Sequence, residues 1–319
     1  MGLSHADSLA GPVLRMTLSS RRPTRRAVAM HLAAVGCACL PLAATAEPTN
    51  VPPPAALAEA PWLTLPPTPA LPTPTRSDVV PINGTKIFFA QFGQGAPVLL
   101  LHGGLGSSNY FGHQIPELAK HFSVIAMDTR GHGRSPVTSG AFGYRLFADD
   151  VAELLDLMQI PKAALVGWSD GAITGLQLAM TRPERVSRLF AFGANTTPDG
   201  LAPNGARSPV FVRYAQRCKA EYAQLSPHPE KWPQLVDGLR VMWRTQPAFS
   251  KEKLASIKAP TAVADGEHDE IIRRAHTEMM ARQIPGARLV LLAKVSHFAM
   301  LQNPPQFTAA LLDFLKDAG

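Results

Sequence analysis

The sequence predicts an α/β fold: a mostly parallel sheet flanked by helices, with a helical insertion before the last two strands. The chain of 319 residues is 46% hydrophobic and 17% charged, which is enough apolar content for a large core. From about residue 79, short apolar runs alternate with longer stretches of helical periodicity, as in parallel strands joined by crossover helices. This alternation lapses at residues 198–257, where the pattern is helical with interspersed prolines. We therefore expect residues 198–257 to form a lid.

The first 46 residues are typical of a signal peptide and are left out of the fold. An arginine-rich start leads into an Ala-rich stretch that ends in Ala44-Thr45-Ala46, a small-x-small cleavage pattern. The apolar stretch contains His31 and Pro41 and is too short to span a membrane. We expect a mature chain that begins at Glu47 and is periplasmic or secreted, with the membrane involved only in export; an intact-mass measurement would check this. Ser20-Arg21-Arg22 resembles a twin-arginine signal, and the ordinary secretory route stays open.

Charge, cysteine and histidine content argue against several other classes of protein. The whole chain has a formal net charge of +7, but five of its arginines and one aspartate lie in residues 1–46. The remaining 26 basic and 23 acidic residues include no dense basic run, which argues against nucleic-acid binding. Cys218 is the single cysteine of the mature chain, which excludes an intrachain disulfide, and we interpret it as a packing residue. The ten histidines lack the spacing of a metal site, so neither a metal nor a cofactor is predicted.

The folded domain is expected to begin at residue 77. Residues 47–76 hold ten prolines and almost no charge, and such a segment cannot form a helix interior or a sheet ladder. We interpret 47–76 as an extended linker and 77–319 as one domain, which opens with two short strands around the Asn83-Gly84 turn. Further strands are expected at 97–101, 123–127, 163–166, 188–192, 261–264 and 288–292, and helices at 113–120, 144–158, 170–180, 273–283 and 305–316.

A motif for a nucleophilic serine follows the strand expected at 163–166. Gly167-Trp168-Ser169-Asp170-Gly171 lies between this strand and a helical stretch. In that context Gly-x-Ser-x-Gly places the serine on a sharp strand-to-helix turn, and the glycines let neighbouring elements approach. The start of the helix also offers free N–H groups to a developing oxyanion, among which we expect that of Asp170. The sequence thus predicts Ser169 as the nucleophile.

A second oxyanion donor is expected from an earlier strand end. His102-Gly103-Gly104 follows the strand at 97–101 and predicts a small turn whose N–H, that of Gly104, faces the nucleophile. We interpret the His102 side chain as structural, because the backbone of this turn is what the chemistry uses.

A serine nucleophile needs a general base, and the base needs a group that orients it. His297 lies just past the last strand, and Asp269 follows the strand before it. We expect His297 as the base and Asp269 as the acid that orients it. Asp265 is so close to the strand that the sheet is expected to fix its side chain, and Glu267 is the other carboxylate that we consider less suitable.

Five motifs in this order resemble the α/β-hydrolase superfamily, from about Thr85 to Leu315. They are the His-Gly-Gly turn, the loop Asp128-x-Arg130-Gly131-His132-Gly133-x-Ser135, the serine turn, the Gly-x-x-Asp segment and the terminal histidine. The serine turn, together with Phe192-Gly193-Ala194-Asn195, is most similar to the biphenyl-hydrolase-like group that includes valacyclovir hydrolase. The resemblance implies the α/β-hydrolase fold, a mainly structural loop at Asp128 to Ser135, and no cofactor.

The reaction implied is hydrolysis of a small ester-like substrate (a carboxylic ester, a lactone or an aminoacyl ester) through an acyl-enzyme. A C–C bond hydrolase or a cofactor-free perhydrolase would use the same triad, and both stay open. A non-enzymatic receptor is disfavoured because no triad member is missing. The sequence carries no signal for an oligomeric state.

Four residues are candidates for contact with the substrate: Trp168 and Asp170 beside the nucleophile, and Trp232 and Trp243 in the lid. The Asp170 carboxylate has two interpretations. It is either a first-turn aspartate favoured by the helix dipole or a group that attracts a substrate ammonium. The nine basic and five acidic residues of 198–256 suit a neutral or anionic substrate at least as well.

Overall fold

The computed structural model describes residues 59–317, and an eight-stranded sheet lies at its centre. The predicted signal peptide, residues 1–46, and the first part of the predicted linker lie outside the described residues, so the signal peptide stays a prediction. The strands are β1 (Arg76–Ile82), β2 (Thr85–Phe92), β3 (Ala96–Leu101), β4 (Phe122–Met127), β5 (Ala163–Trp168), β6 (Val186–Phe192), β7 (Thr261–Gly266) and β8 (Arg288–Leu292).

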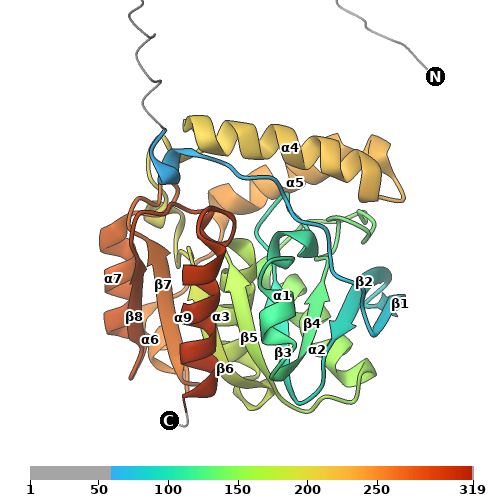
Figure 1. Cartoon of the computed structure of the whole chain (residues 1–319), viewed down its shortest axis with the longest axis horizontal. Helices are drawn as coiled ribbons and strands as arrows, with labels where there is room; N and C mark the ends of the chain where they lie inside the picture. The colour runs from blue at the N-terminus through green and yellow to red at the C-terminus, as the bar shows by residue number, and fades with distance from the viewer. Residues whose placement is uncertain (1–58, 318–319) are drawn as a thin grey trace, which may run out of the picture. The chain divides into compact units, whose positions relative to one another are not determined.

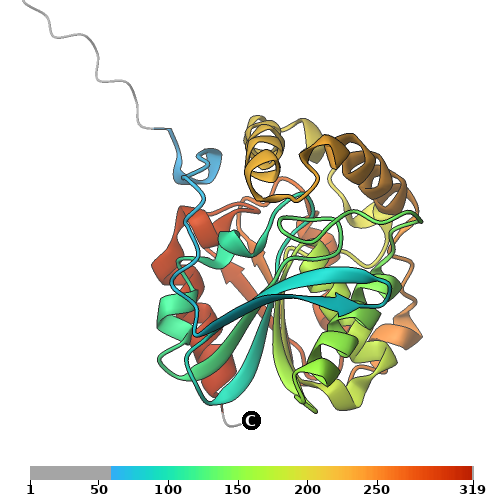
Figure 2. The same ribbon diagram turned by 90° about the vertical axis from the view of Figure 1, so that its right-hand side faces the viewer.

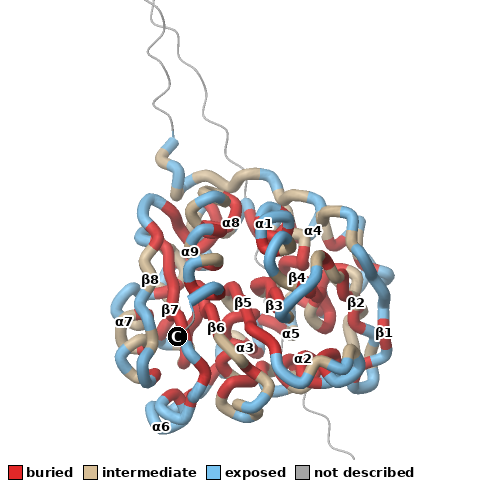
Figure 3. Tube along the Cα trace, turned by 60° about the horizontal axis from the view of Figure 1, so that its bottom comes forward, coloured by how far each residue is buried: buried red, intermediate tan, exposed pale blue. Residues whose placement is uncertain are grey.

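The sheet is mostly parallel, as predicted. Its strand order is β1-β2-β4-β3-β5-β6-β7-β8. The pairs β1/β2 and β2/β4 are antiparallel, and every other neighbouring pair is parallel. All residues of β5 and β7 are buried, because helices cover both faces of a parallel sheet (Figure 3). The antiparallel edge strand β1 instead exposes five of its seven residues.

Helices cover the sheet in two layers (Figure 1). On one face α1 and α9 contact each other, and α9 packs on β6 and β8. Elsewhere α2 contacts α3, α3 contacts α6, and α6 contacts α7. The helices of the body are α1 (Ile115–Leu118), α2 (Tyr144–Leu157), α3 (Asp170–Thr181), α6 (Lys251–Ala255), α7 (Arg274–Gln283), α8 (Ala299–Gln302) and α9 (Pro304–Lys316).

The lid consists of two helices inserted between β6 and β7, as expected. These are α4 (Pro209–Leu225) and α5 (Trp232–Thr245), and they lie together beyond one end of the strands (Figure 2). The expected lid, 198–257, was too long at its C-terminal end. Leu254 of α6 is fully buried, and α6 contacts α3 and α7 in the body. The helical pattern of α6 belongs to the helix layer, and the lid helices end at Thr245.

The N-terminal segment 59–75, which we call the strap, packs on the domain and is not a spacer. It crosses the molecule beside α4 before entering β1 (Figure 1). Its prolines do exclude a sheet ladder, but side chains from distant elements satisfy its carbonyl groups. Arg217 of α4, for example, donates to the carbonyls of Leu65 and Pro66. The predicted boundary at residue 77 was therefore wrong, because these partners lie about 150 residues away in the sequence.

Two other features of the described residues concern membranes and thiols. No helix within residues 59–317 has the length and hydropathy to cross a membrane. Cys218 is free and buried, and burial raises the pKa of its thiol to about 12. A thiol with so high a pKa is unreactive at neutral pH, in keeping with a packing residue.

Candidate active site

Ser169 occupies a strained turn between β5 and α3. Its backbone has φ 54° and ψ −121°, a conformation that costs a residue with a side chain about 1–3 kcal/mol. The turn is held because the Ser169 N–H donates to the Phe192 carbonyl at 2.8 Å, and the Ile173 N–H donates to the Ser169 carbonyl at 3.0 Å. Strand β5 and the first turn of α3 thus fix the predicted nucleophile.

The two glycines of the serine motif permit a close approach of α3 to the sheet. A Cβ at Gly171 would lie 2.0 Å from the carbonyl oxygen of Leu101 in β3. A Cβ at Gly167 would lie 2.4 Å from the Cα of Ala172. Neither space can hold a methyl group, since both neighbours are backbone. The motif is therefore a packing requirement as well as a chemical one.

The structure brings His297 and Asp269 together at the ends of β7 and β8. Nδ1 of His297 lies 2.7 Å from Oδ2 of Asp269, and both side chains are almost fully buried. The N–H groups of Ile271 and Ile272 donate to Oδ1 of Asp269 at 2.7 and 2.8 Å. Because a carboxylate accepts, Nδ1 carries the proton of the neutral ring and Nε2 is left as an acceptor.

The other two carboxylates near β7 have different partners. Asp265 accepts from the Thr277 hydroxyl and from the Gly266 N–H at 2.9 Å. Burial raises the pKa of Asp265 well above its ordinary value, and the neighbouring Asp269 raises it further. Glu267 is exposed and accepts the Lys294 N–H at 2.9 Å. Of the three carboxylates, only Asp269 forms a hydrogen bond to His297 in the described chain.

Burial also sets the protonation of the pair. It lowers the pKa of His297, and the carboxylates of Glu270, Asp265 and Asp170 offset this in part. It raises the pKa of Asp269 to about 7, against hydrogen bonds from Asp265 and from two backbone N–H groups. The imidazole is therefore neutral at neutral pH, as a general base must be.

His297 also depends on a glycine in the loop after β6. A Cβ at Gly193, which has φ +62°, would lie 2.8 Å from Cε1 of the His297 ring. A larger residue there would displace the imidazole. Gly193 belongs to the Phe192-Gly193-Ala194-Asn195 segment that the sequence singled out.

Gly104 and Asp170 lie on either side of the serine, at the ends of β3 and β5. A Cβ at Gly104 would lie 2.4 Å from Oδ2 of Asp170, so the two residues are in close contact. The hydroxyl of Tyr214 in α4 donates to the Gly104 carbonyl at 2.7 Å, which orients this peptide group. Within residues 59–317 neither the Gly104 N–H nor the Asp170 N–H donates a hydrogen bond. Both are available to an oxyanion.

A cavity of about 410 Å³ opens over these residues. Ser169, His297, Gly104 and Asp170 all line it, and no lysine or arginine does. The Ser169 hydroxyl forms no hydrogen bond with a described residue; such contacts are often long in a resting site and tighten with substrate. The walls are mainly apolar and comprise Pro198, Leu201, Ala202, Pro203, Ala206, Phe211, Ile271 and Ile272.

The Asp170 carboxylate is buried at the cavity and held by two neutral donors. The Tyr144 hydroxyl donates to Oδ1 at 2.8 Å, and Nε1 of Trp243 lies 3.0 Å from Oδ1 and 2.9 Å from Oδ2. Burial raises the pKa of Asp170 to about 6, and these two hydrogen bonds limit the rise. Above pH 6 the carboxylate is negatively charged, and no lysine or arginine lines the cavity to pair with it.

The structure brings three of the four predicted substrate contacts to the cavity. Trp168, Asp170 and Trp243 line it, whereas Trp232 does not. The expectation for Trp232 was wrong because it lies at the start of α5, three turns or about 16 Å from Trp243, and packs its ring on Tyr222. Trp232 and Trp243 lie on the same face of α5, but only Trp243 is close enough to the cavity to line it.

Sequence reasoning missed three polar cavity residues: Tyr144, Asn195 and Gln246. The sequence did offer a signal for Asn195, because this residue ends the Phe192-Gly193-Ala194-Asn195 segment that resembles the biphenyl-hydrolase-like group. Tyr144 had a weaker one as the first residue of an expected helix. Nothing in the sequence marked Gln246.

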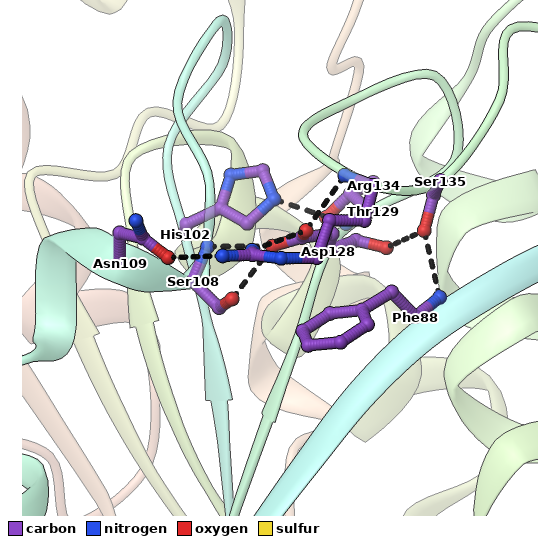
Figure 4. A network of polar contacts seen from close by, with 8 residues as sticks. All are labelled: Phe88, His102, Ser108, Asn109, Asp128, Thr129, Arg134 and Ser135. Atoms are coloured by element: carbon purple, nitrogen blue, oxygen red, sulfur yellow. Dashed lines mark hydrogen bonds and ion pairs between the residues drawn. The ribbon is translucent and has the colours of Figure 1, made fainter. Parts of the chain in front are cut away.

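The loop after β4 is a structural brace, in line with the sequence interpretation (Figure 4). Asp128 is fully buried, and its carboxylate accepts from the Ser108 N–H at 2.8 Å and from the Ser108 hydroxyl at 2.6 Å. Its second oxygen accepts from the Arg134 N–H at 2.8 Å and from the Arg134 guanidinium at 3.0 Å. None of these residues lines the cavity. In residues 59–317, no group of three or more metal-ligating side chains is placed to bind a metal.

Comparisons with known proteins identify the fold and the family. The alpha/beta hydrolase fold family matches residues 96–227. Human serine hydrolase BPHL is 31% identical over 266 residues, which cover 78% of this chain and 90% of the human protein. The enol-lactonase from Burkholderia xenovorans LB400 is 25% identical with a TM-score of 0.62, over 75% of this chain and 100% of that one. An esterase from Thermogutta terrifontis is 25% identical with a TM-score of 0.61, over 76% and 98%. The chain therefore belongs to the α/β-hydrolase superfamily.

Proposed function

We propose that this protein hydrolyses a small ester-like substrate through an acyl-enzyme on Ser169. One observation carries the proposal: the strained Ser169, the His297 ring that Asp269 holds from behind, and the two residues with unused N–H groups, Gly104 and Asp170, border one cavity. These are the parts that acyl transfer needs, namely a nucleophile, an oriented base and an oxyanion hole.

The residues act in two half-reactions. Oγ of Ser169 attacks the carbonyl carbon while Nε2 of His297 takes its proton, and the Gly104 and Asp170 N–H groups stabilise the oxyanion. Collapse of the tetrahedral intermediate releases the alcohol, which takes the proton from His297. Water then attacks the acyl-serine by the same route and returns Ser169 and neutral His297. Asp269 holds the imidazole and stabilises its positive charge.

The cavity favours a substrate with an apolar group and, of the two charges, a positive one. Its walls are mainly apolar, and the Asp170 carboxylate has no cation beside it. Arg213 and Arg217 of the basic insertion bind strap carbonyls, so they supply no charge to the cavity. An anionic substrate is therefore less well supported than the insertion's composition suggested. We propose that aminoacyl esters are preferred, in line with the resemblance to the valacyclovir-hydrolase group.

The test combines covalent labelling with a panel of substrates. A fluorophosphonate probe should label the wild type at Ser169, and labelling should be lost in Ser169→Ala. The panel comprises short-chain and long-chain p-nitrophenyl esters, an α-amino ester with its deaminated analogue, and a C–C substrate with a cleavable diketone. We expect the short and amino esters to be turned over fastest. Labelling without any ester turnover, or faster turnover of the diketone, would contradict the ester assignment.

A further inference from the structure

The strap contacts the segments that carry both the candidate acid and the candidate base. At its start, the ring of Trp62 stacks on His268, with ring centroids 3.8 Å apart and planes 17° from parallel. His268 is the residue before Asp269. Its own N–H donates to the Val295 carbonyl at 3.0 Å, which joins the acid segment to the base segment. The Trp62 ring therefore contacts His268, the residue at which the acid segment is hydrogen-bonded to the base segment.

Gln302, at the end of α8, connects the strap to the base segment. Its Nε2 donates to the carbonyls of Thr64 at 2.9 Å and Trp62 at 3.3 Å, and to the Ser296 hydroxyl at 3.0 Å. Its Oε1 accepts the Ser296 N–H at 2.7 Å. Ser296 is the residue before His297. The Gln302 side chain thus forms hydrogen bonds to the strap backbone and to the N–H and hydroxyl groups of Ser296, next to the candidate base.

The strap also holds the lid helix α4. Arg217 donates to the Leu65 carbonyl at 2.6 Å and to the Pro66 carbonyl, and Arg213 donates to the Leu63 carbonyl. The same helix supplies Tyr214, whose hydroxyl orients the Gly104 peptide. Three segments that border the active site, far apart in the sequence, therefore share contacts with five consecutive strap residues, 62–66.

We propose that the Trp62 ring and the backbone carbonyl groups of residues 62–66 form a positioning element for catalysis, with Trp62 as its main residue. This inference rests on the proposed function, since it assigns Trp62 a role in the same reaction. Asp269 and His297 lie on loops beyond the strand ends, where the sheet ladder no longer restrains them. The strap supplies that restraint from outside. It acts through His268 and Ser296, so Trp62 is a positioning residue and touches no substrate.

A strap that merely covers the domain would have a different signature. Its loss would lower the melting temperature and leave the folded enzyme as active as before. A positioning strap affects kcat in the folded enzyme, because a displacement near 1 Å at a reacting group can slow a reaction about a hundredfold. KM should change little, since Trp62 does not line the cavity.

The first experiment compares Trp62→Ala with two matched variants in the full chain. Leu63→Ala is the control, because Leu63 is the next residue, its side chain is exposed, and alanine keeps the carbonyl group that accepts from Arg213 of α4. Trp62→Phe keeps an aromatic ring for the stack. Assayed well below each melting temperature, Trp62→Ala should lose roughly tenfold to a hundredfold in kcat on a p-nitrophenyl ester, with KM within about twofold. Trp62→Phe should recover most of the loss, and Leu63→Ala should match the wild type.

A double-mutant cycle with His268→Ala tests the route of the effect. If Trp62 acts through the stack, the double variant should lose little more than Trp62→Ala alone. Additive losses in kcat would overturn the route through His268. An unchanged kcat in folded Trp62→Ala would overturn the positioning role.

Hydrogen–deuterium exchange gives a readout that does not depend on turnover. In Trp62→Ala, peptides that cover 266–270 and 294–302 should exchange faster than in the wild type, while β6 should not change. If the wild type proved inactive on every ester, the proposed function would fail, yet this measurement would still decide the strap. Faster exchange confined to residues 59–75 would overturn the proposal.

Discussion

The strand ends and the lid contribute to the same cavity in different ways. Ser169, Asp269 and His297 come from loops that follow β5, β7 and β8, and their positions depend on backbone hydrogen bonds, a strained turn and glycines with no room for a side chain. The lid contributes Phe211, Tyr214 and Trp243, which reach the cavity from helices held by side-chain contacts. Backbone constraints tolerate few residue types, whereas helix packing tolerates many.

This difference separates the type of reaction from the choice of substrate. The strand ends carry the residues that the proposed acyl transfer uses. The lid and the residues facing it define the shape and charge of the cavity. Asp170 belongs to both regions, since it follows Ser169 at the start of α3 and its carboxylate is held by Trp243 of the lid.

The largest effect should come from removing the nucleophile. Ser169→Ala should lower kcat on an activated ester by about a millionfold, because the triad acts as a unit. The fold should persist, which circular dichroism would check, since the turn is held by backbone hydrogen bonds that alanine keeps. Retention of a tenth of the activity would show that the reaction does not use the strand-end serine.

The next effect distinguishes two buried carboxylates at the end of β7. Asp269→Asn should lower kcat by about ten-thousandfold, because an amide in place of the carboxylate favours the wrong imidazole tautomer. Asp265→Asn should stay within about tenfold of the wild type, since Asp265 has no hydrogen bond to His297 and an asparagine can still donate to Asp269. Kinetics of the two variants on one p-nitrophenyl ester decide between them. An inactive Asp265→Asn variant together with an active Asp269→Asn variant would show that Asp265, and not Asp269, orients His297.

The body of this molecule could be predicted from sequence far better than its periphery. The order Ser169, Asp269, His297 follows from motifs at strand ends, where local backbone geometry limits the residue types, and the alternation of strands and helices follows from periodicity. The strap could not be predicted, because its polyproline-like composition is the same whether a segment is free or packed on distant side chains. The cavity role of Trp243 and not Trp232 depends on how far the cavity extends along α5, which no local pattern encodes.

A smaller effect concerns the negative charge of Asp170, the residue that belongs to both regions. The wild type should prefer an α-amino ester over its deaminated analogue, and Asp170→Asn should remove a preference of about 2 kcal/mol, or roughly thirtyfold in kcat/KM. The pKa of Asp170 is raised to about 6, so the preference should be present above pH 6 and disappear as the pH falls through that value. The ratio of the two esters cancels the ionisation of His297, which both require. Equal rates on the wild type at pH 7 would rule out amine recognition.

The smallest effect tests the lid through its two tryptophans. Trp243→Phe keeps an aromatic ring in the cavity but removes the Nε1 donor to Asp170, which leaves Tyr144 as the remaining side-chain donor to the carboxylate. The loss of one hydrogen bond of about 1 kcal/mol should raise KM for the amino ester roughly fivefold, and it should move the pH at which the amine preference appears upward, since that bond lowers the pKa of Asp170. Trp232→Phe is the matched control, because Trp232 lies on the same helix and packs on Tyr222 away from the cavity. We expect its KM and its pH dependence to equal those of the wild type. Equal changes in both variants would mean that α5 affects the substrate through lid stability and not through the bond from Trp243 to Asp170.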